Sequence, residues 1–157
     1  MKIVELTEKE VAKARDFAFE LIRTGRPGTF ENYFIGTVGE IAYGKFTNQE
    51  VNFKVYSHFK GDGGADFKNT QIKTTTWEGR DKQLKVGTSD KSLKLASVQK
   101  YVLAHAIITN PTNAVLIGEI SKENLIKRAV LNKSWKCLVV GEHRLDVWYG
   151  YDTAKSS

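Results

Sequence analysis

The part of the sequence that decides the expected fold reads Ala65-Asp66-Phe67-Lys68-Asn69-Thr70-Gln71-Ile72-Lys73-Thr74-Thr75-Thr76. The asparagine in its middle favours a turn and the threonines after it favour a strand, so this stretch predicts a short β-hairpin. Side chains alternate between the two faces of a strand, so Gln71 and Lys73 point the same way while Ile72 faces the core. With Phe67 also turned to the core, Asp66 is left near Gln71. We therefore expect an acid, an amide oxygen and an ammonium to meet on one face.

Two helices are predicted before this hairpin. The first begins with the capping box Thr7-Glu8-Lys9-Glu10 and continues with apolar residues at helical spacing until the glycines and proline of residues 25–28. The second is expected over residues 31–46, with glycines that often mark close packing. Glu40 lies beside its apolar face, where a carboxylate is costly unless a positive group meets it.

The remaining elements alternate between strands and turns. Residues 77–97 are polar and are interpreted as a long loop with weak structure. The other elements predicted are strands over residues 51–55, 101–108, 114–120 and 136–140, a turn or mobile loop over residues 61–64, and a short helix over residues 122–129 capped by Ser121. This order predicts a single domain over residues 1–157 of the α/β (α+β) class, with a central mixed β-sheet flanked by helices.

The chemistry of the predicted hairpin suits hydrolysis of a phosphodiester bond. Oxygen ligands hold a hard divalent cation that offsets phosphate charge and activates water. A lysine stabilises the negative transition state or orients the attacking water. The formal net charge of +6 is compatible with a polyanionic partner such as nucleic acid.

The residues Asp66 and Gln71-Ile72-Lys73 resemble the motif of the PD-(D/E)XK nucleases, a superfamily of restriction enzymes, junction resolvases, repair nucleases and phage nucleases. That family carries an acid at a strand start and an acid-x-Lys triplet on the next strand. Many members add a glutamate from a preceding helix, where this chain has Gly39-Glu40-Ile41-Ala42. The resemblance spans roughly residues 30 to 76.

The resemblance implies a restriction-endonuclease-like core and a DNA endonuclease that depends on Mg²⁺ or Mn²⁺. The catalytic residues that it implies are Glu40, Asp66, Gln71 and Lys73. It implies Glu40, Asp66 and the backbone carbonyl of Ile72 as metal ligands, with Lys73 positioning or polarising the attacking water. Asp62 is the alternative first acid if Asp66 points away.

Gln71 departs from the family, because an acid is usual at its position and glutamine offers an oxygen without charge. Two interpretations therefore stay open: an active endonuclease, and a nucleic-acid-binding module on a degenerate, inactive nuclease fold. A third is a protein-interaction domain in which Asp66 and Lys73 form an ordinary cross-strand ion pair.

The segment after the hairpin is expected to contact DNA. Its cations would grip the phosphate backbone, and Trp77 is able to stack on a base. These cations are Arg80, Lys82, Lys85, Lys91 and Lys94. The alternative is a solvated loop, since acidic residues in the same segment dilute its charge.

The expected compartment is inferred from three signals that the sequence does not show. No apolar run reaches the roughly 18 residues of a membrane span, the N-terminus has no secretory apolar region, and the single cysteine has no internal disulfide partner. We therefore expect a cytoplasmic, intracellular protein with no membrane partner, and the resemblance points to a phage or mobile-element endonuclease. Cutting two strands usually takes two active sites, so a homodimer or higher homo-oligomer is possible. The DNA structure that the protein prefers also stays open.

Overall fold

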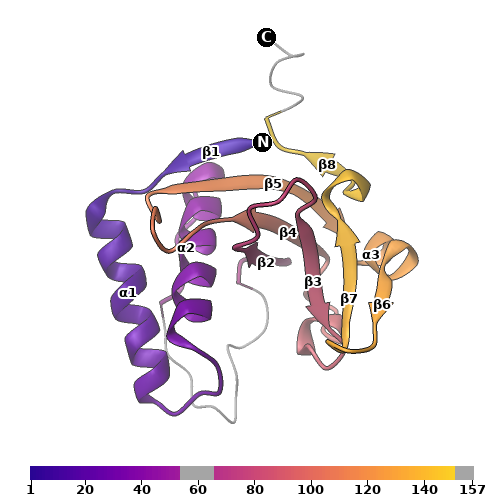
Figure 1. Ribbon diagram of the computed structural model, residues 1–157, viewed down its shortest axis with the longest axis horizontal. Helices are drawn as coiled ribbons and strands as arrows, with labels where there is room; N and C mark the ends of the chain where they lie inside the picture. Colours follow the sequence, from indigo (N-terminus) through magenta and orange to yellow (C-terminus); the bar gives the residue numbers. More distant parts are fainter. Residues whose placement is uncertain (54–65, 151–157) are drawn as a thin grey trace.

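A computed structural model describes residues 1–53 and 66–150 of the chain and has an α+β fold (Figure 1). Its larger sheet, sheet A, contains β1 (Lys2–Glu5), β5 (Asn113–Ser121), β4 (Lys100–His105) and β2 (Thr70–Thr75) in that order, and β8 (Val147–Trp148) also pairs with β5. The strands β2 and β4 run parallel, whereas the other pairs of sheet A are antiparallel. The prediction of a mixed sheet is therefore confirmed.

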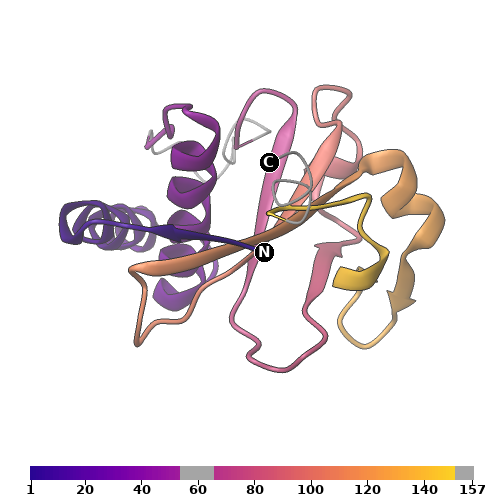
Figure 2. The ribbon, with the colours of Figure 1, turned by 90° about the horizontal axis from the view of Figure 1, so that it is seen from above.

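A second, smaller sheet, sheet B, contains the antiparallel strands β3 (Gln83–Gly87), β7 (Cys137–Gly141) and β6 (Val130–Asn132). Helices α1 (Glu8–Arg23) and α2 (Phe30–Thr47) lie on one side of sheet A, and sheet B lies on the other with α3 (Lys122–Arg128), as Figures 1 and 2 show. Sheet A thus separates a layer of helices from a layer that is mostly sheet.

Two apolar cores result from this layering. In β4, Val102 and Ala104 pack under the helices, while Tyr101 and Leu103 pack against sheet B. All four are at most 1% exposed. A strand buried on both faces reads as a continuous apolar run, which is why this strand was predictable from its sequence.

The two long helices begin and end as their sequences indicate. Thr7 Oγ1 accepts a hydrogen bond from the Glu10 backbone N–H at 3.1 Å, and Glu10 Oε1 accepts one from the Thr7 N–H at 2.8 Å, so the capping box is confirmed. On α2, a Cβ added at Gly39 would overlap the hydroxyl oxygen of Thr74 on β2. Glycine at this position therefore lets α2 lie directly on β2.

Residues 77–97 were expected to be a long loop, and this prediction is wrong. They contain β3 and the short 3-10 helix η1 (Lys91–Leu93). Leu84 and Val86 are fully buried and alternate with exposed Gln83 and Lys85, which is the period of a half-buried strand. Lys85 obscures this pattern, because charged residues are common in loops and therefore favour the prediction of one.

The other predictions vary in outcome. Residues 51–53 lie outside any strand, and the rest of the strand predicted over residues 51–55 lies outside the described residues, as does the turn predicted over residues 61–64. The helix capped by Ser121 is confirmed as α3, whose cap accepts from the Asn124 N–H at 3.1 Å. Within the described ranges, no helix is both long and apolar enough to cross a membrane.

Candidate functional site

The predicted hairpin is present in a very short form. Phe67 and Thr70 exchange two backbone hydrogen bonds, with the Phe67 N–H donating to the Thr70 carbonyl at 3.0 Å and the Thr70 N–H donating back at 3.1 Å. Asn69 takes a left-handed conformation with φ of +80°, which asparagine tolerates better than most residues. The turn folds Asp66 and Phe67 back onto the edge of β2 that faces away from β4.

Asp66 lies on this outer edge of β2. Its Oδ2 accepts a hydrogen bond from the backbone N–H of Ile72 at 2.7 Å. The N–H and C=O of one strand residue point to the same edge, so the Ile72 carbonyl oxygen also points to the outer edge. The structure therefore brings the Asp66 carboxylate to the Ile72 backbone, whereas the sequence predicted it beside the Gln71 side chain. The Ile72 side chain is buried in the core under the helices, which confirms its predicted direction.

Gln71 and Lys73 point to the opposite face from Ile72, again as predicted. They pair in register with Tyr101 and Leu103, whose side chains pack toward sheet B. Gln71 is 7% exposed, and its Oε1 is buried without a hydrogen-bond partner among the described residues. A buried acceptor in this state favours a ligand that can donate to it or coordinate it.

Lys73 is held by a residue that sequence reasoning did not select. Its Nζ lies 2.6 Å from Oδ2 of Asp90, and the two side chains are only 25% and 22% exposed. Burial acts to raise the pKa of Asp90, but the Lys73 ammonium beside it prevails and lowers that pKa below its ordinary value. An acid in the segment predicted to contact DNA thus fixes the side chain of Lys73.

Asp90 is itself fixed at the start of η1. Its Oδ1 accepts from the Ser92 N–H at 2.9 Å, and Ser92 Oγ shares a hydrogen bond of 2.8 Å with the Tyr101 hydroxyl. An aspartate whose side chain bonds a backbone N–H two residues on is a common local turn. The sequence Asp90-Lys91-Ser92 carries that signal, although it does not show that Lys73 is the partner.

Glu40 lies on the part of α2 that passes over β2. Gly39 contacts Thr74, and one helical turn later the ring of Tyr43 lies 5.1 Å from that of Phe67. Glu40, which is partly buried, lies on the same stretch of α2, directly after Gly39. The fallback acid Asp62 lies outside the described residues.

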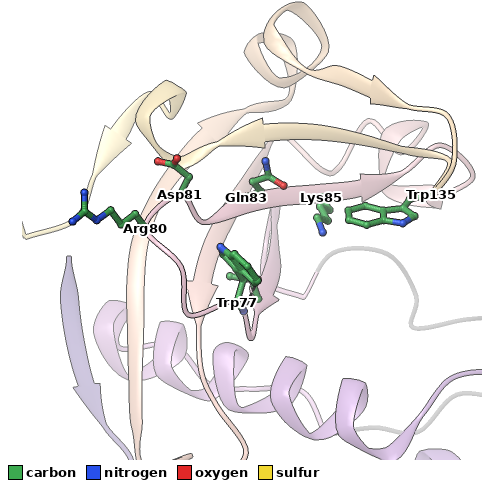
Figure 3. Close-up of a pocket in the computed structure, with 7 residues that line it drawn as sticks. Trp77, Arg80, Asp81, Gln83, Lys85 and Trp135 are labelled. Carbon is green, nitrogen blue, oxygen red and sulfur yellow. Dashed lines mark hydrogen bonds between the residues drawn. The ribbon is translucent and has the colours of Figure 1, made fainter.

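The residues predicted to contact DNA fall into three groups. Trp77, Arg80 and Lys85 line a pocket of about 430 Å³, together with Thr75, Asp81, Gln83 and Trp135 (Figure 3). Lys91 and Lys94 are exposed on and just after η1, next to the Lys73–Asp90 pair along the chain. Lys82 is partly buried and donates from Nζ to the Gly79 carbonyl at 3.1 Å, so it has a structural partner. Trp135, in the turn between β6 and β7, was not predicted.

Within residues 1–53 and 66–150, no group of three or more histidine, cysteine, aspartate and glutamate side chains comes together. A cation at the β2 edge would therefore rely on the Asp66 carboxylate, on neutral oxygens, and on Glu40 as a second acid.

No protein-family model, curated protein or solved structure matches this chain.

Proposed function

We propose that this protein is a metal-dependent DNA endonuclease that hydrolyses phosphodiester bonds at the outer edge of β2. The observation that carries the proposal is the hydrogen bond between the Asp66 carboxylate and the Ile72 backbone, on the strand that also bears Gln71 and Lys73. This arrangement supports the resemblance of the hairpin to the PD-(D/E)XK motif and a restriction-endonuclease-like core.

The donor atoms present fit Mg²⁺ or Mn²⁺, which prefer oxygen ligands. Asp66 and the Ile72 carbonyl would hold the cation, and Glu40 on α2 is the candidate for a second carboxylate. The orphaned Gln71 Oε1 would supply a further oxygen from the sheet B face of β2, the face opposite α2, in place of the usual acid. When bound, the cation offsets phosphate charge and makes water a better nucleophile at neutral pH.

Lys73 supplies the positive charge of the protein at this site. An ammonium held in a partly desolvated position stabilises the charge that develops on a phosphate during attack. Asp90 keeps the Lys73 side chain in one place before substrate binds, and the Ser92 N–H in turn holds Asp90. A phosphate reaching Lys73 would share the ammonium with Asp90, because a lysine has three N–H donors.

A second candidate function is a nucleic-acid-binding module on an inactive nuclease fold. Gln71 favours it, because a neutral, buried side chain contributes less to a hard-cation site than a carboxylate does. The paired state of Lys73 also favours it, since Asp90 neutralises the lysine without any substrate.

Cleavage assays on supercoiled, branched and single-stranded DNA, each in Mg²⁺ and in Mn²⁺, separate the two candidates. Under the endonuclease proposal the wild type cuts at least one substrate, and Lys73→Ala and Asp66→Asn lose cutting while still shifting DNA on a gel. Lys127→Ala is the matched control, because Lys127 forms an exposed ion pair on α3. Cutting by Lys73→Ala at the wild-type rate refutes the assigned site, whereas gel shifts without cutting on every substrate favour the binding module.

A further inference from the structure

Two exposed tryptophans share one pocket beside the candidate site. Trp77 and Trp135 are each 62% exposed, and both line the pocket of about 430 Å³. Exposed aromatic side chains that line one pocket are typical of surfaces where a partner binds. In the view of Figure 3, Lys85 lies between the two indoles and Arg80 lies on the far side of Trp77.

The fold brings the two tryptophans together from distant parts of the chain. Trp77 follows β2, whereas Trp135 lies in the turn before β7, and β3 connects the two regions by pairing with β7. A Cβ added at Gly79 would overlap the Trp77 indole, so the backbone there lies against this ring. Lys85 Nζ lies 3.9 Å from the ring centroid of Trp135, a cation–π contact. Both indoles are thus held by protein contacts before a ligand binds.

The chemistry of the pocket matches one nucleotide. An indole face stacks on any base, and a cation beside it meets the phosphate. Arg80 and Lys85 supply two positive charges against the single negative charge of Asp81. The volume of the pocket lies within the range of small-molecule sites.

The pocket also lies close to the catalytic lysine of the motif. Thr75 lines it and belongs to β2, two residues after Lys73. Residues i and i+2 of a strand share a face and lie roughly 7 Å apart. A DNA strand whose base occupies the pocket would therefore run along β2 toward Lys73.

We propose that this pocket, formed by Trp77, Trp135, Arg80 and Lys85, binds an unpaired nucleotide of a single-stranded DNA segment. Bases inside a duplex have both faces covered by their neighbours, so only an unstacked base offers a face to an indole. This inference rests on the proposed endonuclease and names its substrate class: DNA that carries an unpaired segment, in place of an intact duplex.

The test measures binding without cleavage. Fluorescence anisotropy in EDTA compares a labelled single strand of about 12 nucleotides with the same strand annealed to its complement. Trp135→Ala and Trp77→Ala are each expected to weaken single-strand binding roughly tenfold, with little change for the duplex. Phe19→Ala is the matched control, because Phe19 is an exposed aromatic residue on α1. Equal losses on both forms, or no loss on the single strand, would overturn the proposal.

A second pair of variants guards against a change in folding. Trp135→Phe keeps an aromatic face and is expected to retain most of the single-strand affinity, whereas Trp135→Leu keeps apolar bulk and is expected to lose it. If Trp135→Leu binds the single strand as well as Trp135→Phe does, stacking is not the interaction and the proposal fails.

The outcomes separate this inference from the proposed function. If the protein cuts no DNA but binds the single strand through its tryptophans, the pocket proposal is supported and the endonuclease proposal is refuted. The opposite outcome has two parts: intact duplex is cut as fast as flapped duplex, and both tryptophan variants bind single strands as the wild type does. This outcome refutes the pocket proposal and supports the endonuclease proposal.

Discussion

Lys73 Nζ lies 2.6 Å from Asp90 Oδ2, in an ion pair that joins the strand of the nuclease-like motif to the loop after β3. The sequence predicts Lys73 in a group with an acid and an amide, and the acids of the following segment reduce the positive charge of that segment. The structure instead shows one of those acids holding the lysine. The face of β2 that carries neutral Gln71 thereby gains a carboxylate from elsewhere in the fold.

The first prediction concerns the stability that this pair contributes. The pKa of Asp90 is lowered from its ordinary value of 3.8, so its contribution is fully present above that value and is lost as pH falls through the lower, folded-state value. Asp90→Asn is expected to reduce the free energy of unfolding at neutral pH by about 1–2 kcal/mol. The difference from the wild type should shrink as pH falls below 3.8 toward the lower, folded-state pKa of Asp90.

Urea unfolding of both proteins at neutral and acidic pH measures this difference. Glu10 and Asp146 also have lowered pKa values, so the wild type loses stability in acid through them as well. Only the gap between the variant and the wild type reports on Asp90. A gap that stays constant from neutral to acidic pH would contradict the assignment.

The second prediction concerns Gln71. Its side chain is buried and its Oε1 lacks a partner among the described residues, so a carboxylate at this position meets a desolvated environment. Gln71→Glu is expected to lower the melting temperature in EDTA and to recover it when Mg²⁺ or Mn²⁺ is added, since a ligand that binds only the folded state stabilises it. Thermal unfolding with and without the cation provides the measurement.

Gln71→Met serves as the control, because it keeps the size of the side chain without offering an oxygen ligand. It should show less cation-dependent stabilisation than either Gln71→Glu or the wild type. Identical responses of all three proteins to the cation would place the metal away from residue 71.

Local patterns made most of the helices and the central strands predictable. The Thr7–Glu10 capping box and the apolar period of α1 act within a few residues, and so does the apolar run of β4. β3 was missed because it is short and carries a lysine on its outward face. Three further strands were also not predicted, because each has at most four residues: β1, β6 and β8. Strands this short form by pairing with a neighbouring strand, which the local sequence does not reveal.

The candidate site was predictable to the extent that it follows strand parity. The shared face of Gln71 and Lys73 and the burial of Phe67 and Ile72 follow from alternation along a strand. The ion pair of Lys73 with Asp90 and the pocket shared by Trp77 and Trp135 depend on how β3 and β7 pack beside β2. Those contacts link residues far apart in the sequence, where local pattern carries no signal.

The third prediction tests the contact between α2 and β2 with two glycines of one helix. A Cβ at Gly39 would overlap the Thr74 hydroxyl, whereas nothing lies within 4 Å of the corresponding position at Gly36. Gly36→Ala is therefore expected to stabilise the protein by about 0.5–1 kcal/mol through helix propensity. Gly39→Ala is expected to destabilise it by about 1–3 kcal/mol through overpacking.

Chemical unfolding of both variants, and of Gly39→Ala combined with Thr74→Ala, gives the comparison. The second substitution removes the hydroxyl that the new methyl group would meet, so the double variant should be more stable than additivity predicts. Additive effects, or a Gly39→Ala variant as stable as Gly36→Ala, would show that α2 does not lie against Thr74 as described.

The last prediction separates cations that bind phosphate from one that supports the fold. Arg80 and Lys91 are exposed, on the pocket and on η1 respectively, whereas Lys82 is partly buried and bonded to the Gly79 carbonyl. Each phosphate contact releases counterions, so Arg80→Gln and Lys91→Gln should each reduce the slope of log affinity against log salt by about 1. Lys82→Gln should lower the melting temperature and leave the slope unchanged, and Lys127→Gln should leave the slope unchanged as well. Anisotropy titrations at several salt concentrations give the slopes. A slope that falls for Lys82→Gln and stays fixed for Arg80→Gln and Lys91→Gln would reverse these roles and move the DNA path away from the tryptophan pocket.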